Sequence, residues 1–195
     1  MAGGFTEEQK TIIRAELIAS GYELSVKCGI KKMTVAMVAN AAKVAVGSFY
    51  NFFDSKESFV IALMEEYEKN AMKQMSEHFL NDGTITLKEF LSIYRENYKP
   101  ENNFLLQIGL NDWVWFKSHL KDSVYLNKTS ELEKYEFMFT KIKGIRQDAD
   151  PGVVVNFIKS IYAMYQNRDT LFEESLQTNV DLIFDSIYRY LKEEC

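Results

Sequence analysis

Residues 33–57 read MTVAMVANAAKVAVGSFYNFFDSKE, and this stretch predicts two short helices joined by a tight turn. Thr34 is a good N-cap for the first short helix, which places its apolar residues on one face. The second short helix begins near Val46, and Ser55 caps a much longer helix that follows. Two short helices packed on longer supporting helices are the elements of a helix-turn-helix.

The rest of the chain also predicts helices. Residues 6–9 read TEEQ and fit a capping box that opens the first helix, and Gly29 ends it. After a turn at residues 81–83, capping and proline signals predict helices over about 86–98, 102–116, 123–143, 151–167 and 175–192. No stretch alternates with period two for long enough to indicate a sheet. We therefore predict an all-α protein of nine helices and no strands, with a domain boundary after residue 54.

The second short helix carries groups that suit the edge of a base pair. Gly47 would let the backbone come close to DNA, and Ser48 and Asn51 could present a hydroxyl and an amide to bases. Tyr50 would reach a phosphate, while the neighbouring phenylalanines, Phe49, Phe52 and Phe53, pack inward. Each of these residues taken singly also fits a plain helical core. Their combination favours a DNA-binding element.

The stretch from Thr34 to Glu57 resembles the N-terminal domain of the tetracycline-repressor (TetR) family of regulators. That family has a threonine opening helix two, then Ile/Val-Ala, glycine, Thr/Ser, a hydrophobe and tyrosine, and it closes with phenylalanine and Ser-Lys-Glu. The resemblance covers residues 10–65. It implies that Ser48 is the small hydroxyl residue of the recognition helix and that Asn51, where the family varies, reads a base. It also implies phosphate contacts from Thr34, Tyr50 and Lys56.

Three positions depart from the family pattern. Lys43 stands where the family has a turn glycine, and a lysine in a left-handed turn costs ~1 kcal/mol unless it gains a contact such as a phosphate. Ala45 replaces the serine that caps the recognition helix, which costs about as much. Val46 occupies a position where a basic or polar residue is common. Because the recognition helix has no Lys or Arg, it cannot read guanine by a bidentate contact, and specificity would depend on Ser48, Asn51 and DNA shape.

The resemblance implies that residues 1–54 bind DNA and that residues 55–195 bind a ligand and form a homodimer. The last two predicted helices have broad apolar faces that suit a four-helix interface. Two copies would then read a palindromic double-stranded operator whose half-sites lie one helical turn, ~34 Å, apart. The alternative is that these faces close the core of the monomer. The predicted interface residues are Phe157, Ile161, Tyr165, Val180, Phe184 and Ile187.

The middle of the chain is rich in aromatic residues that could line an apolar pocket for a small effector. Trp113 and Phe116 are three residues apart and share a helix face. Ordinary core packing is the alternative interpretation of such a pattern. Few charged residues can be placed on the inner faces, which disfavours a strongly charged effector. The predicted pocket residues are Tyr94, Phe104, Trp113, Phe116, Phe139 and Tyr162.

Composition limits the remaining classes of function. The net charge is −5, and residues 1–60 hold seven basic and six acidic side chains, so the acid excess lies after residue 60. This distribution suits one local phosphate-binding face and not a protein that coats nucleic acid. The two cysteines and two histidines form no pattern typical of a disulfide framework or a metal site, so no cofactor or metal is expected. Without a secretory signal or a long apolar run, we expect a cytoplasmic protein with no membrane contact.

Two rival interpretations remain at this stage. A helical adaptor or sensor with a degenerate DNA-binding domain would share the fold, although it would not need Thr34, Tyr50 and Lys56 together. An all-helical enzyme is less well supported, because the sequence has no nucleophile elbow, no glycine-rich phosphate loop and no Glu-x-x-His pair. We therefore expect no catalytic residues.

Overall fold

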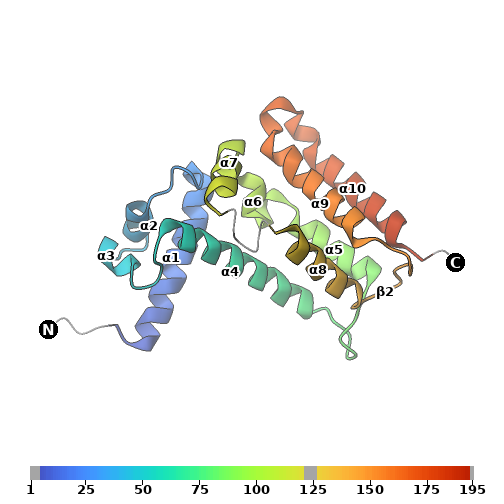
Figure 1. Ribbon diagram of the computed structural model, residues 1–195, viewed down its shortest axis with the longest axis horizontal. Helices are drawn as coiled ribbons and strands as arrows, with labels where there is room; N and C mark the ends of the chain where they lie inside the picture. Colours follow the sequence, from blue (N-terminus) through green and yellow to red (C-terminus); the bar gives the residue numbers. More distant parts are fainter. Residues whose placement is uncertain (1–4, 121–126, 194–195) are drawn as a thin grey trace.

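The computed structural model describes residues 5–120 and 127–193, which form ten α-helices and one very small sheet (Figure 1). The N-terminal helices are α1 (Glu7–Cys28), α2 (Val35–Ala41), α3 (Val46–Phe49) and α4 (Lys56–Ser76). The central part comprises β1 (Ile85–Thr86), α5 (Leu87–Asn97), η1 (Pro100–Asn102), α6 (Phe104–Gln107), α7 (Leu110–His119), α8 (Lys128–Phe139) and β2 (Ile142–Lys143). The C-terminal part comprises α9 (Pro151–Gln166), η3 (Arg168–Thr170), η4 (Glu173–Ser175) and α10 (Leu176–Leu191).

The helix starts follow the capping residues of the sequence. Thr6 forms the predicted capping box with Gln9, in which each side chain accepts a hydrogen bond from the other residue's backbone N–H. Thr34, Thr86 and Asp150 cap α2, α5 and α9 through their side-chain oxygens. These caps satisfy backbone donors that would otherwise lack partners at a helix start, which explains why the boundaries were predictable.

Two predictions about the central part are wrong. The expected helix over 102–116 is broken into η1, α6 and α7, and Gly109 lies in extended backbone at the start of α7. The prediction of no strands is also wrong, because β1 and β2 pair in parallel with Ile85 opposite Ile142. Each strand has two residues, too few to show a period of two. The predicted helix start at Ser123 lies outside the described residues, and α8 ends at Phe139, before β2.

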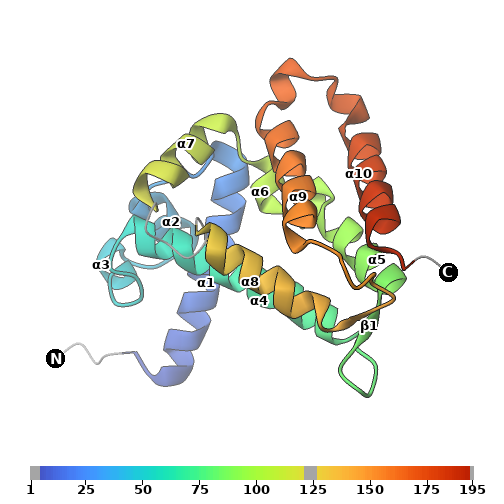
Figure 2. The ribbon, with the colours of Figure 1, turned by 45° about the vertical axis from the view of Figure 1, so that its right-hand side comes forward.

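The buried apolar residues form two cores, which we call the head core and the body core. The head core joins α1, α2, α3 and the first half of α4 with α6 and α7. The body core joins the end of α4 with α5, α8, α9, α10 and the small sheet. In Figures 1 and 2 the first three helices lie at one end of the molecule, α9 and α10 lie side by side at the other, and α4 runs between them. Tyr162 packs against both cores.

The head core and the body core do not divide the chain at residue 54, where the domain boundary was predicted from the sequence. Phe104, Leu105 and Phe116, which follow that boundary by fifty residues or more, are buried in the head core. The head is therefore completed by α6 and α7, which come from the middle of the chain. Along the described residues, 5–120 and 127–193, no helix has the length and apolar character needed to span a bilayer.

Candidate nucleic-acid interface

The turn between α2 and α3 is built around Lys43. Its φ is 57°, and it is the only non-glycine residue with positive φ in the part of the chain that the structure describes. Its N–H donates to the carbonyl of Asn40, and the N–H of Val44 donates to the carbonyl of Ala39. These bonds close the turn in the left-handed conformation that the family pattern assigns to glycine. The strain predicted for Lys43 is therefore present.

Helix α3 begins without a side-chain cap. Ala45 occupies the N-cap position, and no side chain there accepts a hydrogen bond from the first turn. The helix is held instead by Phe49, which is fully buried and contacts Phe53 and Phe59 at ring-centroid distances of 5.4 and 5.3 Å. Phe53 is likewise buried, whereas Phe52 is half-buried against Phe5. The packing of these rings fixes the orientation of a helix of only four residues.

The opposite face of α2 and α3 is open to solvent. Tyr50 is 53% exposed, and most of the other predicted reading residues are exposed as well: Thr34, Lys43, Val46, Gly47 and Asn51. Ser48 is half-buried. The hydroxyl oxygen of Thr34 accepts from the N–H of Met37, which leaves its O–H free to donate outward. Apart from the half-buried Ser48 and Lys56, the residues predicted to contact bases and phosphates are therefore accessible to another molecule.

Gly47 lies at an open position of α3. A Cβ atom built at this position would meet no atom of the described residues within 4 Å, and Gly47 has ordinary negative φ. Packing within the chain therefore does not require glycine there. The backbone of α3 is therefore open to close approach at Gly47.

Lys56, for which a phosphate contact was predicted, is half-buried and contacts other parts of the protein. Its Nζ donates to the backbone carbonyl of Lys31 at 3.0 Å and lies 4.5 Å from the ring centroid of Trp115. Burial lowers the pKa of the Lys56 ammonium below its usual value, while the carboxylates of Glu57 and Asp112 oppose that shift. The predicted phosphate ligand thus links the α1–α2 turn to α7 in this structure.

Comparisons with known proteins agree with this geometry. Residues 17–63 match the model for the family described as bacterial regulatory proteins, tetR family. The repressor DhaR of Mycobacterium sp. strain GP1 is 31% identical over 195 residues, a match that covers 91% of this chain and 93% of DhaR. The chain belongs to the TetR family.

Other TetR-family proteins match in sequence or in fold. The repressor NemR of Escherichia coli K12 is 33% identical over 96 residues, which cover 49% of this chain and 46% of NemR, so the match spans less than half of that protein. A putative TetR-family regulator from Rhodococcus sp. has a TM-score of 0.68 and 14% identity, covering 93% of this chain and 100% of that one. The similarity to the Rhodococcus protein concerns the fold alone.

The predicted pocket residues lie in and between the two cores of this TetR-family chain, and not all of them contact one another. Trp113 packs on Phe116 and on Tyr162, at ring-centroid distances of 5.6 and 5.9 Å. Tyr162 contacts Tyr98, which in turn contacts Tyr94. Phe104 joins through the ring of Tyr67 at 5.6 Å. Phe139 packs against the body core instead.

We call the contact zone of Tyr67, Tyr94, Tyr98, Trp113 and Tyr162 the seam, because it lies where the two cores meet. The hydroxyl groups of Tyr98 and Tyr162 are hydrogen-bonded to each other, and that of Tyr94 is hydrogen-bonded to Tyr135. Burial raises the pKa of Tyr94 to about 12 and raises that of Tyr162 as well, so these phenols are neutral at pH 7.

Two further polar groups at the seam were not predicted from sequence. The Nδ2 of Asn103, a fully buried residue, lies 3.4 Å from the hydroxyl of Tyr162. The indole Nε1 of Trp113 is buried and has no hydrogen-bond partner among the described residues. A buried N–H without a partner costs about 1–3 kcal/mol, so this donor is available to an acceptor that enters the seam. Asn103 could have been noticed in the sequence only if the helix break had been predicted.

Most of the predicted dimer residues point into the protomer, which corrects that prediction. Phe157 is half-buried, while the other five are buried in the body core: Ile161, Tyr165, Val180, Phe184 and Ile187. A side chain with no exposed surface in the protomer cannot contact a partner. The outward faces of the C-terminal helices instead carry Leu182, which is 59% exposed, together with Ser186 and Ala163.

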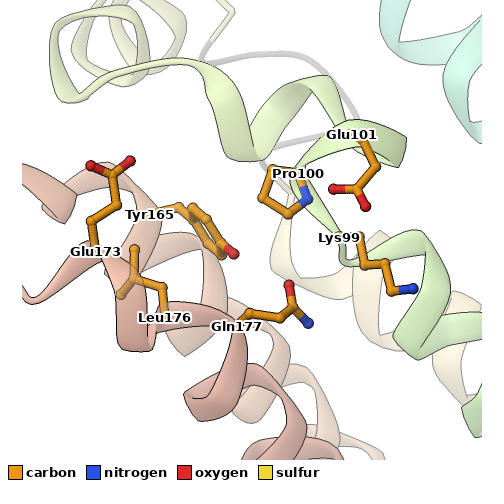
Figure 3. Close-up of a pocket in the computed structure, with 7 residues that line it drawn as sticks. All are labelled: Lys99, Pro100, Glu101, Tyr165, Glu173, Leu176 and Gln177. Atoms are coloured by element: carbon orange, nitrogen blue, oxygen red, sulfur yellow. The ribbon is translucent and has the colours of Figure 1, made fainter.

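A separate surface cavity of about 350 Å³ lies between the η1 segment and the C-terminal helices (Figure 3). None of the predicted pocket residues lines it. Figure 3 shows the ring of Tyr165 and Pro100 on opposite walls, with charged side chains around the rim. The cavity is open to solvent, in contrast to the seam. Its lining residues are Lys99, Pro100, Glu101, Tyr165, Glu173, Leu176 and Gln177.

Proposed function

We propose that this TetR-family regulator is a repressor that binds a palindromic operator as a homodimer and is released by a small effector. The observation that carries the proposal is the open face of α2 and α3. There Tyr50 and Asn51 are exposed, and a Cβ atom at Gly47 would meet no atom of the described residues within 4 Å. An exposed surface that carries polar side chains and allows close approach to the backbone suits the major groove of DNA.

The proposed DNA contacts fall into two classes. Ser48 and Asn51 would contact base edges, with Val46 and Gly47 close to them. Thr34, Lys43 and Tyr50 would contact phosphates and fix the register of the head. With no arginine or lysine on α3, base contacts alone give limited discrimination, so the sequence-dependent shape of the operator contributes to specificity.

A dimer is proposed because one α3 of four residues makes few contacts. Helices α9 and α10 lie side by side at the end of the molecule opposite the first three helices (Figures 1 and 2). Pairing their outward faces about a two-fold axis would make a four-helix interface centred near Leu182. The heads then lie at the outer ends of a symmetric molecule, as reading of an inverted repeat requires.

The effector is proposed to enter the seam. Its walls are aromatic rings and neutral tyrosine hydroxyls, which favour a mainly apolar or aromatic molecule. Because the Nε1–H of Trp113 has no partner among the described residues, we expect the effector to carry a hydrogen-bond acceptor, such as a carbonyl oxygen. An effector that separates the two cores stabilises a state with a different distance between the two heads. It releases DNA to the extent that it binds this state more tightly than the DNA-binding state.

A helical sensor with a degenerate head is the alternative, and two observations favour it. The strained Lys43 and the uncapped Ala45 each destabilise the α2–α3 unit. Both costs are about 1 kcal/mol, small beside the burial of Phe49, so the head is expected to remain folded and able to bind.

The test is selection of binding sites from random duplex DNA by the full-length protein. We expect an inverted repeat to be enriched and the affinity to fall steeply with salt concentration. Tyr50→Ala and Asn51→Ala should each weaken binding about tenfold, whereas Asn81→Ala, an exposed asparagine in the turn after α4, should not. Failure to enrich any sequence at low salt would refute the repressor and support the degenerate sensor.

A further inference from the structure

Both backbone groups of Lys31 are held by other parts of the chain. Its N–H donates to Oδ1 of Asp112 on α7 at 2.7 Å, and its carbonyl accepts from Nζ of Lys56 on α4 at 3.0 Å. Lys31 lies in the turn between α1 and α2, three residues before Thr34, which caps α2. The position of the DNA-reading unit therefore depends on two side chains outside it.

Asp112 is built into this junction. Its residue is 8% exposed, and its second oxygen accepts from the N–H of Gly109 at 3.3 Å. Gly29, at the end of α1, has φ of +84°, and a Cβ atom there would lie 2.6 and 2.7 Å from the two carboxylate oxygens. The turn thus fits directly against the carboxylate. A buried carboxylate is costly unless it is hydrogen-bonded, so the two N–H donors are essential to it.

Helix α7 connects this junction to the seam. Trp115 stacks beneath the ammonium of Lys56, and Phe116 is buried in the head core. Trp113, next to Asp112 in the chain, lies against Tyr162 at the seam. Helix α7 therefore contacts the α1–α2 turn through Asp112 and the proposed effector site through Trp113.

We propose that Asp112 is a positioning residue for DNA binding, which fixes α7 to the backbone of Lys31 so that the head, α6 and α7 move as one rigid body. This inference rests on the proposed function. An effector that displaces Trp113 then moves the α1–α2 turn through Asp112, because the intervening backbone is helical and stiff. The α1–α2 turn receives this displacement in addition to any movement of α4.

The test uses the full-length protein, its selected DNA site and two variants of the same residue. Asp112→Ala removes both acceptors, while Asp112→Asn retains one oxygen that can accept from the N–H of Lys31. Asn111→Ala, an exposed neighbour on α7, is the matched control. Amide hydrogen exchange of residues 29–34 reports the junction itself, and fluorescence anisotropy reports the Kd for DNA.

In Asp112→Ala we expect exchange of the 29–34 segment to be at least about tenfold faster and the Kd to rise about tenfold. Asp112→Asn should lie between this variant and the wild type in both measurements, and Asn111→Ala should match the wild type. Exchange in the buried part of α4 should not change, which separates positioning from general destabilisation. If Asp112→Ala proves too unstable to purify, the intermediate behaviour of Asp112→Asn decides the question.

Wild-type affinity in Asp112→Ala or in Asp112→Asn would overturn the proposal, as would a rise in Kd without faster exchange at residues 29–34. These outcomes differ from failure of the proposed function. In that case the wild-type protein would select no DNA, although the exchange experiment could still be performed.

Discussion

Lys43 combines a backbone conformation that is unfavourable for folding with a side chain at the proposed binding surface. Its backbone adopts a φ of 57° at the turn of the helix-turn-helix, and its side chain is exposed beside α3. The conformation costs about 1 kcal/mol for a residue with a Cβ atom. A phosphate contact from the ammonium would offset this cost only when DNA is bound. Stability and affinity should therefore respond in opposite directions to its replacement.

We predict that Lys43→Gly raises the free energy of unfolding by about 1 kcal/mol and weakens DNA binding. The slope of log K against log salt should decrease in magnitude by about one, because one phosphate contact is lost. Urea denaturation and anisotropy titrations at several salt concentrations measure the two effects. Lys43→Asn, which tolerates the same conformation without charge, is the control for the loss of affinity. An unchanged salt slope in both variants would exclude the phosphate contact.

Lys56 leads to a contrasting prediction at the same scale. Its Nζ is engaged by the carbonyl of Lys31 and the ring of Trp115, so we expect it to affect DNA binding only through the position of the head. Lys56→Met keeps the aliphatic stem and removes the ammonium. We expect weaker DNA binding with an unchanged salt slope in the same titrations. A decrease of about one in that slope, as for Lys43→Gly, would show that Lys56 contacts phosphate after all.

At the scale of elements, helix starts were predictable because capping is local. Thr6, Thr34, Ser55 and Asp150 each bond to backbone within three residues, and a sequence window contains everything that such a cap needs. The break between α6 and α7 was not predictable. It depends on Arg168, whose guanidinium donates to the carbonyls of Leu106 and Gln107 from more than sixty residues away. The two-residue strands depend equally on distant partners.

The weak element of the head is α3, which begins at the uncapped Ala45. We predict that Ala45→Ser stabilises the protein by about 1 kcal/mol, because the new hydroxyl can accept from the N–H of Gly47 or Ser48. Thermal or urea unfolding measures the change. Ala41→Ser, at an exposed position inside α2, is the control and should be neutral or slightly destabilising. Equal effects of the two substitutions would show that capping does not limit α3.

At the scale of the whole molecule, the apolar periodicity of α9 and α10 predicted that each helix has a buried face. It did not predict whether that face packs within the protomer or against a partner. Ile161, Val180 and Phe184 pack against the protomer's own α5 and tyrosines, so the predicted dimer surface is a core surface. The seam was partly predictable, because aromatic side chains are usually packed against other apolar groups. Which of the rings contact one another depends on the tertiary arrangement. The two short helices of the head were predicted most fully, since the residues that form them come from one short stretch, while the DNA contacts assigned to them stay a prediction.

The revised dimer surface gives a prediction of its own. Leu182→Glu places a charge at a side chain that is 59% exposed in the protomer, so the monomer should still fold. The variant should sediment as a monomer and bind the selected DNA at least about tenfold more weakly, because two heads are no longer joined. Phe137→Glu on α8, at a side chain with the same 59% exposure, is the control and should remain dimeric. A dimeric Leu182→Glu variant would place the interface elsewhere.

The central claim is that two copies of the open α2–α3 face read one duplex together. A hydroxyl-radical footprint of the wild-type protein on its selected DNA tests this most directly. We predict two protected patches, related by the symmetry of the inverted repeat and centred one helical turn, ~34 Å, apart or a multiple of it. A single protected patch, or two patches on opposite sides of the duplex, would contradict the account.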